Sequence, residues 1–567
     1  MPPTKDFAEA AQQWYLDRLY ADLAKAKQVC VPHARTGLSD TEKVHLRGLL
    51  CGYSPDEIAC KLNKTPTGVK PSLTKTLYRY VEQLTGRSPN TLGNWRDVVD
   101  WLEAEYKIRS FLVSVPRRED WGDAPDVALF SGRYGDLSSL TKWIVQDGCR
   151  LVTIVGMGGM GKTRLGVKVA KEIAQEFEYV IWRSLGDAPT LRELLADLLE
   201  FLSYESSELV KDSHSEAIAS TAQKISELLK FLQRHRCLVI LDDVEMILAS
   251  GEFAGYCRQG YQDYSQLFQK IGEVPLRSCL LLLSGEKPIA VASLEGPLLP
   301  VRCLQLTGLQ PESAQEILTD QGLCVTDPGF SELIRRYGGH PAALKIVSTT
   351  IVELFKGNIL QFLQQSSLIV GDALRNILDR QFARLSELEL EIIYALALHS
   401  QTVSADELQG QMWRSVSGTE LVGALDSLKR RSLIENISEQ PGEILFSLPP
   451  VMKKYVVNQF IYRFVQNLAI ALETQEFKKM GLVRTHALVN RRSSDSGKLI
   501  QSRTILTRVR DALLTRFRGE ENLEEKLTQL LLDCTENSYS DLGYIKLNLN
   551  ELLQSLNGYR KGHDQSS

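Results

Sequence analysis

The 567-residue sequence is too long for one hydrophobic core, because single domains rarely exceed about 250 residues. At about 150 residues per domain its length predicts three or four domains. Hydrophobic residues make up 43% of the chain and charged residues 24%, which is typical of globular proteins. The net charge of -4 excludes a global attraction to nucleic acid, so any such binding must be local.

Cysteines and apolar runs indicate the compartment. Ten cysteines are scattered singly through the sequence with no CxxC pair. This pattern argues against a structural zinc site or a disulfide framework and favours a reducing cytoplasm. The longest apolar runs, such as residues 280–283, are far shorter than the roughly 20 residues of a membrane helix. We therefore expect a soluble cytoplasmic protein with no membrane partner.

Residues 1–110 are predicted to form an all-helical module. Residues 38–80 contain the run Gly52-Tyr53-Ser54-Pro55-Asp56-Glu57-Ile58-Ala59, then Leu62 and Thr67-Gly68-Val69-Lys70. This segment resembles the helix-turn-helix of LuxR-type regulators. Its spacing places Ile58, Ala59, Leu62, Val69 and Leu73 inward, and Lys64, Thr67, Lys70 and Lys75 outward.

Two features of this module bear on DNA binding. Pro71 falls within the second helix and is predicted to delay or kink it. The helix also lacks an arginine or asparagine placed for bidentate reading of bases. Docking of another protein is therefore favoured, and DNA binding is the alternative.

Residues 111–129 contain Pro116 and Pro125 and are predicted to be a linker. From residue 130 to 308, short apolar strands alternate with amphipathic helices, as in a parallel α/β sheet. The expected strands are Leu151–Val155, Tyr179–Trp182, Leu238–Leu241, Leu280–Leu283 and Val301–Leu306.

The strongest motif is Gly156-Met157-Gly158-Gly159-Met160-Gly161-Lys162-Thr163, which matches the phosphate-binding loop G-x-x-x-x-G-K-[ST] in full. The loop follows an expected strand and precedes an expected helix that begins near Lys162. The glycines let successive N–H groups point toward a phosphate, and the helix N-terminus adds unpaired donors. Lys162 is predicted to bind the β- and γ-phosphates, and Thr163 to bind Mg²⁺.

A second motif supports the first. The apolar run 237–241 ends in Asp242 and Asp243. Asp242 is predicted to hold the magnesium shell, and Asp243 to orient the water that attacks the terminal phosphate. Asp243 and Lys162 are the predicted catalytic residues.

After residue 308 the sequence is almost wholly helical. We expect a helical domain over 309–380, a winged-helix domain over 381–460 and a helical region over 461–567. Ser386 and Glu389 form a capping box that is predicted to open a helix. Two runs, Leu433–Ile437 and Ile444–Leu448, are predicted to form a hairpin around Pro441-Gly442.

These motifs together resemble the NB-ARC type of STAND signalling NTPases, in particular the bacterial proteins that often carry WD repeats. The resemblance covers roughly residues 130–455. It includes Phe130-Ser131-Gly132-Arg133, whose apolar residue and arginine lie against adenine in the family. It also includes Gly339-His340-Pro341-Ala342-Ala343-Leu344, whose proline packs against the nucleotide. The residues expected to bind ATP or ADP are Phe130, Arg133, Gly156, Gly158, Gly159, Met160, Gly161, Lys162, Thr163, Arg164 and Pro341, with Thr163 and Asp242 as Mg²⁺ ligands.

The resemblance implies a switch that is closed with ADP and that opens and oligomerises when ATP replaces it. Residues 543–553 resemble the stretch that precedes the WD repeats in relatives, and the sequence ends at Ser567, so we expect either a separate protein sensor or effector or a shortened relative. Two positions depart from the family. Gly285 stands where relatives place an arginine that senses the γ-phosphate, with Lys287 as a substitute, and Pro449 replaces a histidine that holds ADP. A slow ATPase is therefore expected. The alternatives are a non-hydrolysing nucleotide-bound scaffold and an ATP-dependent DNA-binding regulator.

Overall fold

A computed structural model of the protein describes Phe7, Ala10 and residues 14–563, except residues 32, 34–36, 63, 65, 90, 107–117, 129, 204–219, 325, 366, 367, 400, 439–443, 475–479, 490–495 and 537–541. The chain divides into two compact units, Met1–Pro116 and Arg117–Ser567. The first unit has one hydrophobic core, and the second has two core clusters, one on each face of its sheet. Within the described residues, no single helix is both long and apolar enough to cross a membrane, although the bent pair Pro341–Phe355 and Ile359–Gln365 meets that requirement by length and composition.

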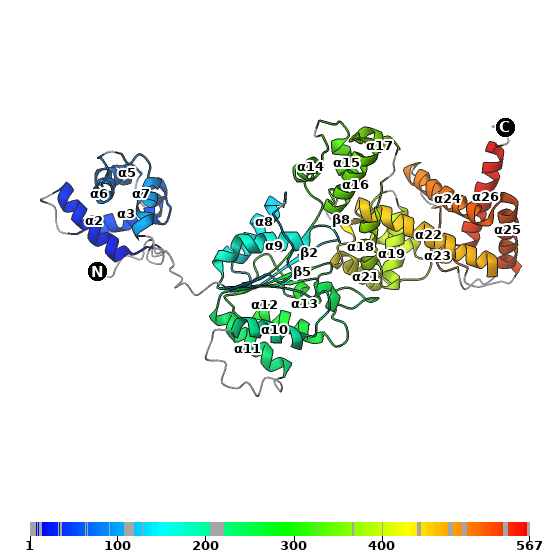
Figure 1. The fold of residues 1–567 in the computed structure, drawn as a ribbon, viewed down its shortest axis with the longest axis horizontal. Coiled ribbons are helices and arrows are strands. Elements are labelled where there is room, and N and C mark those ends of the chain that lie inside the picture. The colour runs from blue at the N-terminus through cyan, green and yellow to red at the C-terminus, as the bar shows by residue number, and fades with distance from the viewer. Residues whose placement is uncertain are drawn as a thin grey trace. The chain divides into compact units, whose positions relative to one another are not determined.

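The first unit is built from helices (Figure 1). Their bounds are α2 Leu16–Cys30, α3 Asp40–Leu50, α4 Pro55–Lys61, α5 Pro66–Lys75, α6 Leu77–Leu84 and α7 Arg96–Tyr106. Capping boxes start two of them: Ser39 with Glu42 begins α3, and Ser54 with Glu57 begins α4. Each box satisfies N–H groups that the first helical turn leaves without partners.

The residues predicted to face inward in this unit are buried, except Leu62, which is half-buried. Lys64, Lys70 and Lys75 are exposed as predicted, and Lys70 pairs with Asp56 at 2.8 Å. The predicted delay of the second helix is wrong, because α5 begins before Pro71 and continues through it. The helix ends at Lys75, and α6 follows at once.

The sheet of the second unit contains six parallel strands among the described residues, in the order β1-β3-β4-β5-β2-β6. Their bounds are β1 Arg118–Asp120, β2 Leu151–Val155, β3 Tyr179–Ser184, β4 Cys237–Asp242, β5 Cys279–Ser284 and β6 Val301–Gln305. Every residue of β2, β4 and β5 is buried, as expected for a parallel sheet covered on both faces. All five predicted strands are confirmed. Strand β1 lies in the segment expected to be a linker, so that part of the expectation is wrong.

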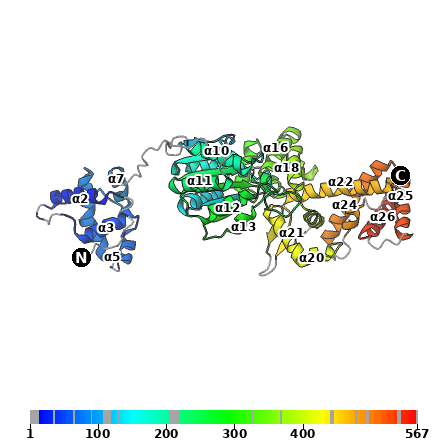
Figure 2. The ribbon, with the colours of Figure 1, turned by 90° about the horizontal axis from the view of Figure 1, so that it is seen from below.

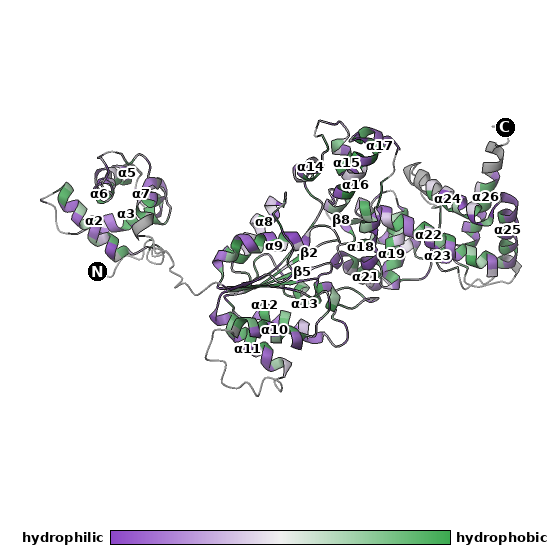
Figure 3. Ribbon diagram, viewed as in Figure 1, coloured by the Kyte–Doolittle hydropathy of each residue, from purple (hydrophilic) through white to green (hydrophobic). Residues whose placement is uncertain are grey.

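Helices cover both faces of this sheet (Figure 1). One face carries α8 Tyr134–Thr141, the π-helical turn Lys142–Gln146, α9 Lys162–Ile173 and the 3₁₀ turn Ala174–Glu176. The other carries α10 Leu191–Ser203, α11 Thr221–Arg234, the 3₁₀ turn Val244–Ile247, α12 Gln262–Glu273 and α13 Ile289–Ala292. The covering helices carry both hydrophobic and hydrophilic residues (Figure 3), as amphipathic helices on a buried sheet do.

Five helices follow the sheet: α14 Pro311–Asp320, α15 Phe330–Arg336, α16 Pro341–Phe355, α17 Ile359–Gln365 and α18 Asp372–Phe382. They lead into α19 Glu387–Leu398, β7 Val403–Ser404, α20 Ala405–Gln411, α21 Gly418–Arg430, β8 Glu435–Ile437 and β9 Leu445–Ser447. The short strands pair antiparallel in the order β7-β9-β8. The expected capping box of Ser386 and Glu389 is present. The expected turn at Pro441-Gly442 lies outside the described residues.

The remaining helices are α22 Pro450–Thr474, α23 Gly481–Thr485, α24 Ser496–Phe517, α25 Glu520–Glu536 and α26 Ile545–His563. The long helix α22 runs from the small antiparallel sheet to the last helices (Figure 2). One continuous apolar cluster joins these helices to α19 and to the face of the large sheet that carries α9.

Candidate functional site

The phosphate loop lies where the sequence predicts it, between β2 and α9. Gly159 and Gly161 have φ values of 82° and 89°, which residues with a Cβ rarely adopt. The first N–H groups of α9 have no side-chain cap. The loop and the helix N-terminus together therefore form an anion-binding concavity.

The Lys162 side chain folds over this loop. Its ammonium donates to the carbonyl oxygens of Gly156 at 3.0 Å and Met157 at 3.4 Å. The cation is thus held directly above the loop, within reach of an anion bound there. Arg164, in the first turn of α9, is exposed.

Asp242 ends β4 and its side chain is buried. Its carboxylate bonds the Thr163 hydroxyl and accepts the Asp243 N–H at 2.9 Å. Burial, and then the charge of Asp243, raise the pKa of Asp242 to about 7. A cation bound there would favour the ionised form.

The hydroxyl of Thr163 and the carboxylate of Asp242 are hard oxygen donors, which Mg²⁺ prefers. No cluster of three or more His, Cys, Asp or Glu ligands occurs in the described part of the chain. Two protein ligands fit Mg²⁺, because this ion usually keeps several waters and binds substrate phosphates as well.

Asp243 lies beside this pair with φ 56°. Ser184, at the end of β3, donates its hydroxyl to the Asp243 carboxylate at 3.0 Å. Burial, followed by the charge of Glu245, raises the pKa of Asp243. Ser184 therefore orients the predicted water-positioning carboxylate, a role that no sequence motif indicated.

The end of β5 lies between the phosphate loop and Asp242, because β5 is the strand between β2 and β4. Here the Gly285 N–H donates to the Glu245 carboxylate at 2.8 Å. The predicted substitute Lys287 pairs instead with Glu295 at 2.8 Å. A carboxylate thus stands where the resemblance places an arginine, and Lys287 does not replace that cation in this arrangement.

Arg133 supports the phosphate loop from outside. Its guanidinium donates at 3.0 Å to the carbonyls of Met160 and Thr307 and pairs with Asp136 at 2.9 Å. Phe130 lines a separate open groove of about 500 Å³ along α8 and α9, together with Tyr134. The structure therefore brings Arg133 to the loop, whereas Phe130 lines the separate groove.

Pro341 is the first residue of α16, and its neighbours contact the phosphate loop. The His340 Nε2 donates to the Gly158 carbonyl at 3.0 Å, while Nδ1 accepts the Ala343 N–H at 3.2 Å. The Ala342 N–H donates to the Gly159 carbonyl at 3.3 Å. These partners require a neutral His340 with its proton on Nε2. Burial lowers the pKa of His340 to about 4.

Acid is expected to destabilise the protein through His340. Because its folded pKa lies below the ordinary 6.5, the unfolded chain binds the proton first as pH falls. The stability contributed by neutral His340 is complete above pH 6.5 and is lost between pH 6.5 and 4, roughly 3 kcal/mol in total. In His340→Asn, which keeps a helix cap, the melting temperature should fall less between pH 7 and pH 5.

Calorimetry of the full chain at the two pH values tests this expectation. The exposed His33 provides the control, since His33→Asn should keep the wild-type pH dependence. His486 is buried with its pKa also lowered to about 4, so part of the dependence should remain in both variants. Equal melting shifts in wild type and His340→Asn would contradict the assignment.

Gln381, in the last turn of α18, also contacts the loop. Its Oε1 accepts the Gly158 N–H at 3.0 Å. Both backbone groups of Gly158 are thus bonded by side chains from helices that follow the sheet. Gln381 belongs to no recognised motif, so no sequence pattern predicted this contact.

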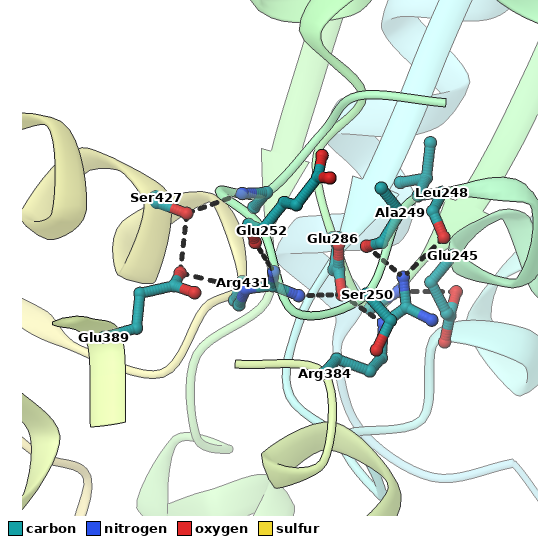
Figure 4. Close-up of polar contacts among 12 residues, drawn as sticks. Glu245, Leu248, Ala249, Ser250, Glu252, Glu286, Arg384, Glu389, Ser427 and Arg431 are labelled. Carbon is teal, nitrogen blue, oxygen red and sulfur yellow. Dashed lines mark hydrogen bonds and ion pairs between the residues drawn. The ribbon is translucent and has the colours of Figure 1, made fainter. Parts of the chain in front are cut away.

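A buried polar network, the Glu286 cluster, joins the end of β5 to the later helices (Figure 4). Its members are Glu286, Arg384, Glu389, Ser427 and Arg431. Both arginines bond one oxygen of Glu286, and Arg431 also donates to Glu389 at 3.0 Å. Arg384 donates at 3.1 Å to the carbonyls of Leu248 and Ala249, beyond β4.

Pro449 lines a small cavity of about 40 Å³ with Met157, Met160 and His340. It lies close to the loop, where the resemblance expects a histidine. Since proline has no side-chain donor, the contacts to the loop come instead from His340 and Gln381.

The parallel sheet, the glycine-rich loop and the adjoining acid define an α/β fold of the P-loop NTPase type. Within it, residues 134–247 match the family model of the NB-ARC domain.

The chain is 37% identical over 493 residues to an uncharacterized WD repeat-containing protein of Nostoc sp., a match that covers 80% of this chain and 38% of the relative. The chain thus spans well under half of that relative's length. Among solved structures it is similar to a Walker-type ATPase of Pyrococcus abyssi, with 14% identity, 57% of this chain and 95% of the other covered, and a TM-score of 0.40. It is also similar to a STAND protein with a tetratricopeptide repeat sensor from Pyrococcus horikoshii, with 16% identity, coverages of 78% and 65%, and a TM-score of 0.32.

Proposed function

We propose that this protein is an ATP/ADP-dependent signalling switch of the NB-ARC/STAND type. The observation that carries the proposal is the double contact to Gly158, whose C=O bonds His340 and whose N–H bonds Gln381. The loop that would bind the nucleotide phosphates is therefore also bonded by residues of two later helical segments. Nucleotide exchange then shifts the population of helix arrangements, because the two nucleotides differ at this loop.

The chain's own residues divide the work of binding. The loop N–H groups and Lys162 hold the phosphates, while Thr163 and Asp242 hold Mg²⁺, which supplies charge neutralisation when bound. Asp243, oriented by Ser184, would position the attacking water. Adenine would lie near Arg133 and the residues around Pro341.

Turnover is proposed to be slow. At the end of β5, Gly285 has no side chain and its N–H donates to Glu245, so this position does not add a second cation to Lys162 for stabilising charge on the terminal phosphate. This observation also favours the second candidate, a nucleotide-bound scaffold without hydrolysis. If the wild type releases no phosphate from ATP, the scaffold is favoured. If the wild type releases phosphate and Lys162→Ala does not, the scaffold is excluded.

The helices after residue 380, with their small antiparallel sheet, are proposed to act as a winged helix that moves on exchange and permits oligomerisation. The WD repeats in the name of the Nostoc relative suggest a sensor or effector built from such repeats. The N-terminal unit is proposed to dock a partner protein, since Lys70 is paired with Asp56. Salt-dependent binding of duplex DNA by the chain would contradict this last proposal.

The nucleotide carried by the purified protein tests the switch directly. We expect gently purified protein, once denatured, to release close to one ADP per chain. Stoichiometric ATP would instead favour the non-hydrolysing scaffold. A protein that releases no nucleotide and binds neither ADP nor ATP on titration would contradict the proposed function.

A further inference from the structure

Gln381 spans the space between the phosphate loop and the end of β5. Its Oε1 accepts the Gly158 N–H at 3.0 Å, although the two residues are 223 positions apart in the chain. Its Nε2 reaches the other side, since a Cβ built on Gly285 would lie 3.3 Å from that atom. The same Cβ would lie 2.9 Å from the Glu245 Oε1. The side chain of Gln381 is thus in contact range of both edges of the site.

This space is where a terminal phosphate would lie. β5 runs between β2 and β4, so the end of β5 is bordered by the phosphate loop on one side and by Asp242 on the other. Thr163 and Asp242 would hold a Mg²⁺ ion on this side of the loop, where it would neutralise charge on the phosphates. The loop N–H groups are the donors that phosphate oxygens use.

The helix that carries Gln381 leaves little room for such a phosphate. A Cβ built on Gly158 would lie 2.3 Å from the Ile377 Cγ2, one turn before Gln381 on α18. The Gly158 N–H is a single donor, so it cannot serve Gln381 and a phosphate oxygen equally. A terminal phosphate bound here and α18 in this position therefore compete for the same space and for the Gly158 N–H.

We propose that Gln381 is the residue that distinguishes ATP from ADP. Gln381 bonds the phosphate loop when ADP is bound, and the third phosphate of ATP displaces it. This inference rests on the proposed function and assigns a residue to its nucleotide discrimination. Displacement of Gln381 would move α18, whose Asp379 also bonds Tyr455 and accepts from Gln459 at 3.1 Å on α22. It would also disturb Arg384 of the Glu286 cluster, which follows α18 directly.

Two substitutions of Gln381 in the full chain should change nucleotide preference in opposite directions. Dissociation constants for Mg·ADP and for the non-hydrolysable analogue Mg·AMP-PNP are measured by titration calorimetry. Gln381→Ala removes the competing bond and should favour AMP-PNP relative to ADP by about two- to tenfold. Gln381→Glu bonds the loop more strongly and repels the terminal phosphate, so it should disfavour AMP-PNP by about tenfold.

Asn376→Ala is the matched control, because it removes an exposed amide from the same helix and should leave the ratio unchanged. Retained ADP binding in both Gln381 variants shows that they fold. If the ratio in both variants equals that of the wild type, the inference is overturned and the proposed function stands. If the wild type binds neither ligand, the proposed function itself fails, and the inference falls with it.

Discussion

Replacing Lys162 by alanine is expected to weaken binding of both ADP and ATP by roughly 100-fold, since charge-assisted hydrogen bonds contribute about 1.5–3 kcal/mol each. The ammonium lies over the loop at 3.0 Å from the Gly156 carbonyl, so its loss removes a positive charge that would face phosphates bound by the loop. Titration calorimetry with both nucleotides gives the change. Any ATP hydrolysis detected in the wild type should disappear in Lys162→Ala.

Lys171→Ala is the matched control for this change, because Lys171 is exposed on the same helix and lies beyond the loop. It removes the same charge from the protein and should bind nucleotide as the wild type does. If Lys162→Ala retained wild-type affinity for both nucleotides, the loop would not be the nucleotide site.

Replacing Glu286 by alanine is expected to release the later helices from the sheet. Arg431 is 2% exposed and would lose its contact to Glu286, and breaking a buried ion pair costs about 3–5 kcal/mol. The arrangement in which α18 lies on the phosphate loop should become less stable accordingly. We expect a lower melting temperature and release of bound ADP at least about tenfold faster, because 1.4 kcal/mol already corresponds to a factor of ten.

Two further variants separate this effect from a general loss of charge. Glu286→Gln keeps an acceptor for one guanidinium and should show a smaller change. Glu252→Ala removes an exposed carboxylate nearby, where only the backbone carbonyl accepts from Arg431, and should behave as the wild type. Wild-type melting and ADP release in Glu286→Ala would mean that the Glu286 cluster does not hold the two parts together.

Local patterns were sufficient to predict the elements that carry the site. The apolar runs 151–155, 238–241 and 280–283 are strands because each is short, continuous and buried on both sides. The phosphate loop was recognisable because its chemistry needs glycines and a lysine at fixed spacing. Serine followed three residues later by glutamate located the start of α19.

The contacts that close the site were not predictable in this way. Gln381 meets Gly158, and Arg431 meets Glu286, only through the tertiary fold, across 223 and 145 residues. A single glutamine or glutamate carries no periodic signal that would mark such a partner. The same limit explains Lys287, which the resemblance offered as a substitute for the missing arginine but whose ammonium is held by Glu295.

Helix α22 connects the neighbourhood of the phosphate loop to the last helices of the chain. Pro450 at its start contacts Gly338, next to the segment that bonds the phosphate loop, and the helix then continues without a break for 25 residues. At 1.5 Å per residue such a helix is about 37 Å long, so a tilt of about 10° at its base would displace its far end by about 6 Å. A displacement of the last helices would therefore be coupled through α22 to the segment beside the phosphate loop.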